Sequence, residues 1–105
     1  MVRVKLLPCI VLAALPALGA PARPVQELST SAGVVMITPI NHASLMIEGG
    51  GKIIHIDPTS AGNYEGLPHG DIILITDIHG DHMDPKVLPK VQKEGTVIFA
   101  PEAVA

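Results

Sequence analysis

Aromatic residues are nearly missing from this chain: they make up 2% of its 105 residues, with one Tyr, one Phe and no Trp. Surfaces that bind single-stranded nucleic acid need rings on which bases stack, so this scarcity argues against that function. Positive charge is scarce too, because seven Lys and Arg stand against ten Asp and Glu and give a net charge of −3. The chain has no basic footprint for a phosphate backbone, and we expect no nucleic-acid partner.

What is abundant is apolar sequence in a short chain. Hydrophobic residues make up 48% of the chain and charged residues only 16%, a composition that argues against a disordered acidic or basic tail. The length is that of one small domain, so a two-domain protein is not expected.

The first 22 residues hold much of this apolar excess. Residues 3–5 carry two positive charges, residues 6–18 are apolar apart from two prolines, and residues 20–22 match a small-x-small cleavage pattern. The pattern predicts a signal peptide over residues 1–22, and therefore export to the periplasm or the outside of the cell, because the run is too short and proline-broken for a membrane span. A buried N-terminal helix is the alternative, but two prolines in its interior would destabilise it strongly.

Cleavage after residue 22 would change the chemistry of the chain. It would remove Cys9, which lies inside the apolar run and so does not fit a lipid anchor. The mature chain would then have no thiolate ligand and no disulfide, and five basic residues would face ten acidic ones. This excess of carboxylates suits a cation site better than an anionic partner. We expect no membrane span in the mature chain.

Strand signals dominate the first part of the mature chain. Residues 23–33 are rich in Pro, Ser and Thr and are expected to form a linker. Strands are predicted at 34–38, 44–48 and 52–57. The glycine triplet at 49–51 supplies the turn between the last two, since glycine tolerates positive φ. These three strands should form an antiparallel meander.

A strand, a helix and a further strand are predicted next. Residues 71–76 contain four consecutive aliphatics, typical of a strand buried on both faces. A helix is expected from its N-cap Asp84 to about residue 93, with Gly95 closing it. Residues 96–100 should form a strand parallel to the previous one, because a helix joins them. The predicted fold class is α/β.

Residues that carry chemistry concentrate at 77–84. Five of the ten Asp and His residues of the chain lie in these eight positions, directly after the most hydrophobic strand. Ligands of α/β proteins bind at the carboxyl ends of strands, and imidazole with carboxylate is a ligand set for zinc, iron or manganese. Alternation along an extended segment would let Asp77, His79 and Asp81 converge, while His82 would point toward a second metal. The competing interpretation is a solvated polar loop ending in a helix cap.

The run DIHGDH at 77–82 resembles the His-x-His-x-Asp-His signature of metallo-β-lactamase-fold hydrolases. Upstream, NHAS at 41–44 before a strand and IHIDP at 54–58 after the glycine-rich turn look like the lactonase-like branch of that superfamily. The resemblance covers residues 34–105. It implies the N-terminal half of an αββα sandwich, made of the antiparallel meander and a β-loop-α-β unit.

The resemblance also implies roles for individual residues. His79 matches a ligand of the first metal, and Asp81 and His82 match ligands of the second. Asp81 would in addition hold or deprotonate the attacking water, as the catalytic residue. The cofactor would be one or two zinc ions, with manganese or iron as alternatives. Asp57 matches an aspartate that ends an early strand and supports the site, and His42 matches a histidine near it.

Two departures from the family pattern alter these expectations. Asp77 stands where the family has its first histidine, and a carboxylate there either coordinates a harder metal or bonds locally. No histidine follows His82, whereas the family takes further ligands from a second half of similar size. A chain that ends at Ala105 would supply one sheet with a bare apolar face, and we expect it to be a fragment.

Three hypotheses for the function follow. The first is an exported metal-dependent hydrolase, in which a metal-activated water attacks a small-molecule lactone, other ester or phosphodiester. The second is a truncated, non-catalytic metal-binding fragment, with Asp77 marking lost chemistry. The third is a half-domain that needs a second half-domain or an oligomer. His55 is expected to be a half-buried strand histidine without a role in any of them.

Overall fold

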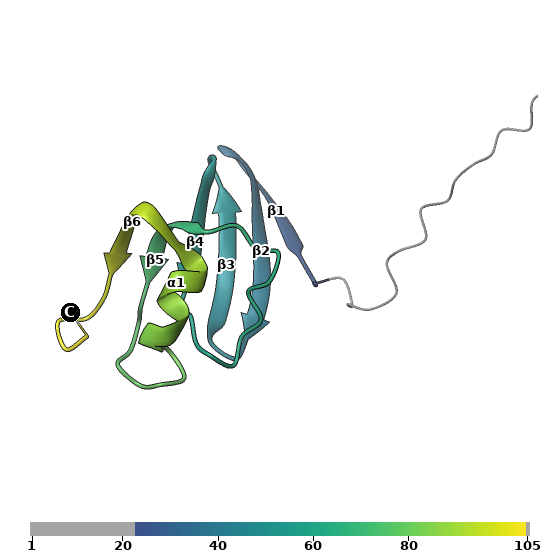
Figure 1. The fold of residues 1–105 in the computed structure, drawn as a ribbon. Helices are drawn as coiled ribbons and strands as arrows, with labels where there is room; N and C mark the ends of the chain where they lie inside the picture. Colours follow the sequence, from purple (N-terminus) through teal and green to yellow (C-terminus); the bar gives the residue numbers. More distant parts are fainter. Residues whose placement is uncertain (1–22, 105) are drawn as a thin grey trace, which may run out of the picture.

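Six strands form one mixed sheet, and a short helical segment crosses one of its faces (Figure 1). The computed structural model describes residues 23–104, so the predicted signal peptide lies outside the described residues. No helix within that range is long and apolar enough to cross a membrane. In chain order the elements are β1 Gln26–Thr30, β2 Gly33–Asn41, β3 Ser44–Gly49, β4 Lys52–Ile56, β5 Gly70–Leu74, the 3-10 turn η1 Pro85–Val87, α1 Leu88–Val91 and β6 Gln92–Phe99.

The antiparallel meander expected from the sequence is confirmed as β2, β3 and β4. Gly50 and Gly51 form the turn between β3 and β4 with φ values of 58° and 74°, which glycine adopts without a steric penalty. The linker predicted at residues 23–33 is wrong for Gln26–Thr30, which pair with β2 as β1. All five residues of β1 are exposed at the sheet edge, so this strand needs no apolar alternation and its composition resembles that of a linker.

The second half of the sheet is parallel, because β5 runs parallel to both of its neighbours, β4 and β6. The parallel pairing of β5 with β6 confirms the prediction made from the helical connection between them. The helix itself is shorter than expected. The segment consists of a 3-10 turn, η1, followed by a single α-helical turn, α1. Pro89 lies in the first turn of α1, where the missing N–H breaks no hydrogen bond of the helix. Gly95 does not close the helix. It lies inside β6 with a φ of 84°, where the register between β5 and β6 shifts.

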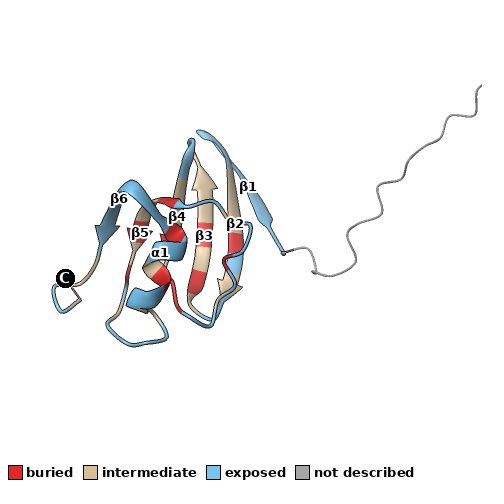
Figure 2. Ribbon diagram, in the orientation of Figure 1, coloured by how far each residue is buried: buried red, intermediate tan, exposed pale blue. Residues whose placement is uncertain are grey.

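A small core lies between the helical segment and the middle of the sheet. Ile73 of β5 is fully buried and packs with Val87 and Val91 of the helical segment and with Tyr64 from the β4–β5 loop. Figure 2 shows this concentration of buried residues on β3, β4, β5 and α1, and mostly exposed ones on β1 and β6. The apolar exposure expected of a single sheet lies on β1, β2 and β6, notably at Leu28, Val34, Val97, Ile98 and Phe99.

His55 of β4 belongs to the interior and is more buried than the sequence suggested. Its side chain is 1% exposed, its Nε2 lies 2.8 Å from the Pro68 carbonyl oxygen, and no partner for its buried Nδ1 exists in the described part of the chain. This arrangement suits a neutral ring that donates from Nε2. Burial lowers the pKa of His55; the bond to the Pro68 carbonyl opposes this, and the nearby His69 lowers the pKa further.

Acidification should destabilise the fold through His55. Because its pKa is lower in the folded chain than in the unfolded chain, the free energy of unfolding should fall as the pH drops below about 6.5. The slope for one proton is at most about 1.4 kcal/mol per pH unit. Urea unfolding between about pH 7.5 and 5 measures it. His55→Leu should flatten the curve, and His69→Ala, which removes an exposed histidine, should largely keep it. An unchanged slope in His55→Leu would contradict this origin.

Candidate metal-binding site

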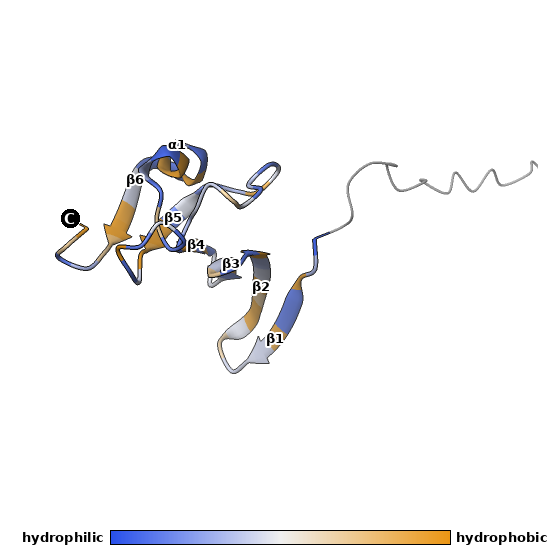
Figure 3. Ribbon diagram, turned by 90° about the horizontal axis from the view of Figure 1, so that it is seen from below, coloured by the Kyte–Doolittle hydropathy of each residue, from blue (hydrophilic) through white to orange (hydrophobic). Residues whose placement is uncertain are grey.

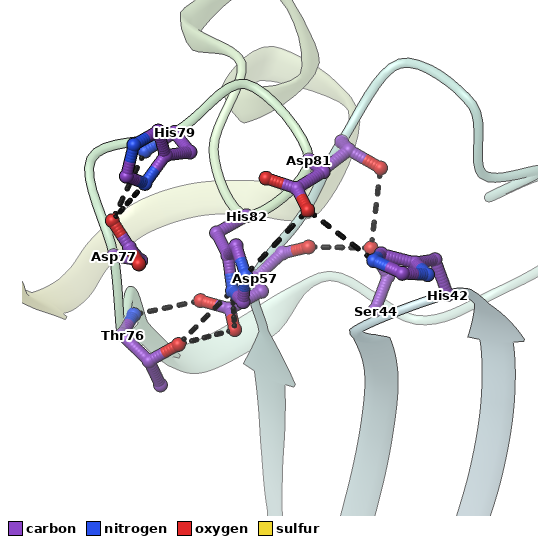
Figure 4. Close-up of polar contacts among 9 residues, drawn as sticks. His42, Ser44, Asp57, Thr76, Asp77, His79, Asp81 and His82 are labelled. Atoms are coloured by element: carbon purple, nitrogen blue, oxygen red, sulfur yellow. Dashed lines mark hydrogen bonds and ion pairs between the residues drawn. The ribbon is translucent and has the colours of Figure 1, made fainter.

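Three segments distant in the sequence meet at the edge of the sheet where the central strands β4 and β5 end (Figure 4). The carboxyl ends of β4 and β5 lie side by side there, because these strands are parallel neighbours. The β2–β3 turn reaches the same edge, since Leu45 near the start of β3 pairs with Ile56 at the end of β4. Asp57 follows β4, residues 76–82 follow β5, and His42 lies in the β2–β3 turn. The topology thus gathers most of the residues singled out in the sequence.

Asp57 is the buried centre of this edge, with 3% of its surface exposed. Its Oδ1 accepts a hydrogen bond from the Thr76 N–H at 2.7 Å, and its Oδ2 accepts from the Thr76 hydroxyl at 2.6 Å and from His82 Nδ1 at 2.9 Å. Its N–H donates to the Leu74 carbonyl, and its own carbonyl accepts from the Ser44 hydroxyl. The backbone has a φ of 47°, a region that Asp tolerates better than most residues. Asp57 is therefore held by both neighbouring strands, which fits the predicted supporting role.

His82 takes its orientation from Asp57. Its Nδ1 lies within bonding distance of the Asp57 carboxylate, so the proton is assigned to Nδ1 and Nε2 keeps its lone pair. The hydrogen bond to Asp57 raises the pKa of His82, partial burial opposes it, and the charges of Asp81, Asp57 and Asp77 add to the increase. A proton therefore competes with a cation for Nε2 up to a higher pH than at an unperturbed histidine.

Asp81 lies between two imidazole rings at the rim of the site. Its Oδ2 is 3.2 Å from Nε2 of His42 and 3.7 Å from Nε2 of His82. The Asp81 side chain is 54% exposed and that of His42 is 67% exposed, whereas that of His82 is 26% exposed. The site thus runs from a buried carboxylate through a half-buried imidazole to a solvent-facing carboxylate, which a water molecule or a small substrate can reach.

Asp77 and His79 form a separate pair, which Figure 4 shows to one side of Asp81 and His82. Oδ1 of Asp77 lies 2.6 Å from Nδ1 of His79 and accepts from the His79 N–H at 3.3 Å. These bonds from His79 lower the pKa of the Asp77 carboxyl. In the described structure Asp77 therefore bonds locally to His79. It holds Nδ1 of His79 as Asp57 holds Nδ1 of His82.

The convergence expected of Asp77, His79 and Asp81 is not found. It assumed an extended segment, but the chain turns after His79, where the His82 N–H donates to the His79 carbonyl at 2.9 Å. The turn places Asp81 beside His82 and away from Asp77. Among residues 23–104 no group of three or more His, Cys, Asp or Glu is arranged so that it could enclose a metal ion.

The donor chemistry of the site nevertheless fits a first-row transition metal. Two imidazoles, each held by a carboxylate at Nδ1, offer Nε2, and Asp81 offers an exposed carboxylate oxygen. Because these donors do not converge, they fit a metal only as part of a larger ligand set. Asp84 stands apart from them, since its side chain accepts from the Lys86 N–H and caps η1 as the sequence predicted.

Thr76 and Ser44 were missed as site residues by the sequence analysis. Thr76 uses its N–H and its hydroxyl on Asp57, and Ser44 ties the β2–β3 turn to the Asp57 carbonyl. The available signal was weak: Thr76 is a hydroxyl residue that ends an aliphatic run directly before Asp77. Its role depends on the pairing of β4 with β5, which the sequence alone does not specify.

Comparison with known proteins identifies the family. Residues 36–105 match the family described as Beta-lactamase superfamily domain, and the chain belongs to it. The UPF0173 metal-dependent hydrolase of Flavobacterium johnsoniae is 45% identical over 53 residues, which cover 45% of this chain and 24% of that protein. The crystal structure of an inferred metal-dependent hydrolase from Parabacteroides distasonis matches this chain with a TM-score of 0.74 and 40% sequence identity. The match covers 79% of this chain and 39% of the hydrolase chain. The chain spans well under half the length of both relatives.

These matches also settle the fold. The six-stranded mixed sheet with its short helix covers part of a metallo-hydrolase structure, so the chain has a partial metallo-β-lactamase fold. The predicted fold, an antiparallel meander followed by a β-loop-α-β unit, is confirmed in this sense.

Replacement of Asp57 should destabilise the fold more than loss of an ordinary carboxylate. Asp57→Ala leaves the Thr76 donors and His82 without their acceptor and places Ala at a positive φ, which together should cost on the order of 3 kcal/mol. Asp57→Asn keeps an acceptor and tolerates the backbone, so its loss should be smaller. Urea unfolding measures both. The control is Asp71→Ala, which removes a more exposed carboxylate that accepts from Ile53 and Lys93. Equal losses for Asp57→Ala and Asp71→Ala would contradict the central role of Asp57.

Proposed function

We propose that this chain carries the motif ligands of a metal-dependent hydrolase from the lactonase-like branch of its superfamily. One observation carries the proposal. A carboxylate engages Nδ1 of each motif histidine, Asp77 on His79 and Asp57 on His82, and so leaves Nε2 of both rings for a metal. Membership of the superfamily and the two relatives named as metal-dependent hydrolases support the assignment.

The proposed roles divide between holding a metal and handling water. His79, Asp81 and His82 would hold one or two zinc ions, with manganese or iron as alternatives. A bound divalent metal supplies a water of lowered pKa and stabilises the negative charge that develops on the substrate oxygen. Asp81, exposed at the rim, orients the attacking water and accepts its proton. Asp57 and Asp77 act through the histidines that they orient.

The proposed substrates share one chemical requirement, an electrophilic carbonyl or phosphoryl centre open to attack by water. Lactones, other esters and phosphodiesters all meet it, and the exposed Asp81 side chain is open to a small molecule from solvent. A panel of these three classes, with each compound offered to the zinc-loaded protein, decides among them. The proposed function is wrong if the zinc-loaded protein hydrolyses no compound of the panel faster than the metal-free protein does.

Export is also part of the proposal. It rests on the apolar N-terminal run and the cleavage pattern at residues 20–22. Amino-terminal sequencing of the protein recovered outside the cytoplasm of its source should begin at about residue 23, because the signal peptide is removed on export. A chain that keeps Met1 would contradict it.

A half-domain that completes its site with a partner is the second candidate. Exposed apolar residues on β6, among them Val97 and Phe99, favour this candidate. Figure 3 shows the carboxyl-terminal end of β6 as strongly hydrophobic. The lack of an enclosing ligand group within residues 23–104 points the same way. Sedimentation of the purified chain, alone and with zinc, distinguishes a monomer from an assembly. A monomer with full hydrolytic activity would exclude this candidate.

Loss of either motif histidine should weaken metal binding and slow turnover. His79→Ala and His82→Ala should lower zinc affinity at least about tenfold and reduce hydrolysis by two orders of magnitude or more, because each removes a ligand. Titration calorimetry and the substrate panel measure the two effects. His69→Ala is the matched control, since it removes an exposed histidine outside the site and should change neither. Retained hydrolysis in both motif variants would overturn the proposed function.

A further inference from the structure

His42 has a backbone conformation that few residues other than glycine adopt. It lies in the two-residue turn that joins β2 to β3, where Asn41 pairs with Ser44, and it has a φ of 48°. Ala43 does not share a positive φ, so the turn has one only at its first central position. Glycine adopts a positive φ without a steric penalty, and histidine enters this region more often than most other residues. Residues other than glycine with a positive φ tend to occur at functional positions.

Packing gives no reason for a histidine at this position. The side chain is 67% exposed, so the ring contributes little to the core. Its contact is with Asp81, 39 residues away, where Nε2 lies 3.2 Å from Oδ2. Two independent observations therefore single out the same residue: a backbone conformation that glycine adopts more readily, and an imidazole directed at the rim carboxylate of the proposed site.

The turn that carries His42 is fixed to the centre of the site. The Ser44 hydroxyl donates to the Asp57 carbonyl and lies 3.3 Å from the Thr59 hydroxyl, both in the interior. The position of His42 is thus tied to the residue that orients His82. Asp81, in contrast, lies in an exposed loop.

The four side chains form one chain of alternating carboxylate and imidazole from the interior to the solvent. Asp57 contacts Nδ1 of His82 at 2.9 Å, Nε2 of His82 lies 3.7 Å from Oδ2 of Asp81, and the same Oδ2 lies 3.2 Å from His42. Figure 4 shows Asp81 between the two rings. His82 is held from inside by Asp57, and His42 is placed to hold Asp81 from the other side.

We propose that His42 is a positioning residue that fixes the rotamer of Asp81, so that its carboxylate faces Nε2 of His82 before a metal arrives. This role rests on the proposed metal-dependent function and deepens it. Preorganisation of two neighbouring ligands lowers the ordering cost of binding and so raises affinity. It also gives a reason for histidine at this turn position, because a glycine there would suit the backbone but would make no contact with Asp81.

The test separates this role from a structural one through variants of the full chain. His42→Gly and His42→Asn both tolerate a positive φ and both remove the imidazole. Ala43→Gly is the matched control, since it loosens the same turn and keeps His42. Three quantities are measured: the unfolding midpoint, the rotamer of Asp81 in the metal-free protein from NMR couplings and carboxyl carbon shifts, and the affinity for Zn²⁺ alone by calorimetry.

A positioning role predicts that His42→Gly folds as well as wild type or better, that its Asp81 averages among rotamers, and that it binds zinc about tenfold more weakly. Ala43→Gly should keep one Asp81 rotamer and the wild-type affinity. The proposal is overturned if Asp81 keeps one rotamer in His42→Gly, or if it already averages among rotamers in wild type. It is also overturned if wild type binds zinc and His42→Gly binds it with the same affinity. If no version binds zinc but Asp81 is fixed only when His42 is present, the proposed function fails and the positioning role stands.

Discussion

The buried carboxylate of Asp57 is the constraint on which the rest of the site depends. A carboxylate that is 3% exposed is costly unless it is fully hydrogen-bonded. Its donors are the N–H and hydroxyl of Thr76 and Nδ1 of His82, all on the segment after β5. Satisfying this one charge therefore brings the motif loop against the end of β4. Hydrogen bonds from the Asp57 N–H and to its carbonyl fix the backbone on both sides of the positive φ, which Asp tolerates better than most residues.

Exposure then distinguishes the residues along the chain of polar contacts. Asp57 is too buried to meet a substrate, His82 presents one nitrogen outward, and Asp81 faces solvent at the rim. The same division repeats on a smaller scale in the Asp77 and His79 pair, where a carboxylate holds one nitrogen and leaves the other. Within residues 23–104 the fold thus orients the proposed metal ligands but does not group three of them around one point.

Much of the fold was predictable because local patterns and tertiary demands agree there. The meander, the aliphatic strand β5, its parallel pairing with β6 and the Asp84 cap follow from alternation, glycine turns, a helical connection and helix-start chemistry. Burial of β5 on both faces is only partial, since three of its five residues are partly exposed. Predictions failed where a tertiary contact replaces the local rule. An edge strand needs no apolar alternation, as Gln26–Thr30 show, and Gly95 serves a register shift inside β6 instead of a helix end.

The sequence by itself determined the kinds of donor in the site, their position after a buried strand, and the family that their spacing identifies. It did not determine which carboxylate would engage which imidazole. His79 bonds to Asp77 two residues away, whereas His82 reaches back 25 residues to Asp57 and His42 contacts Asp81 across 39 residues. The two long pairings exist because β4 ends beside β5 and the β2–β3 turn meets the same edge. Only the tertiary structure decides that arrangement, since a turn after His79 redirects side chains that alternation alone would have placed together.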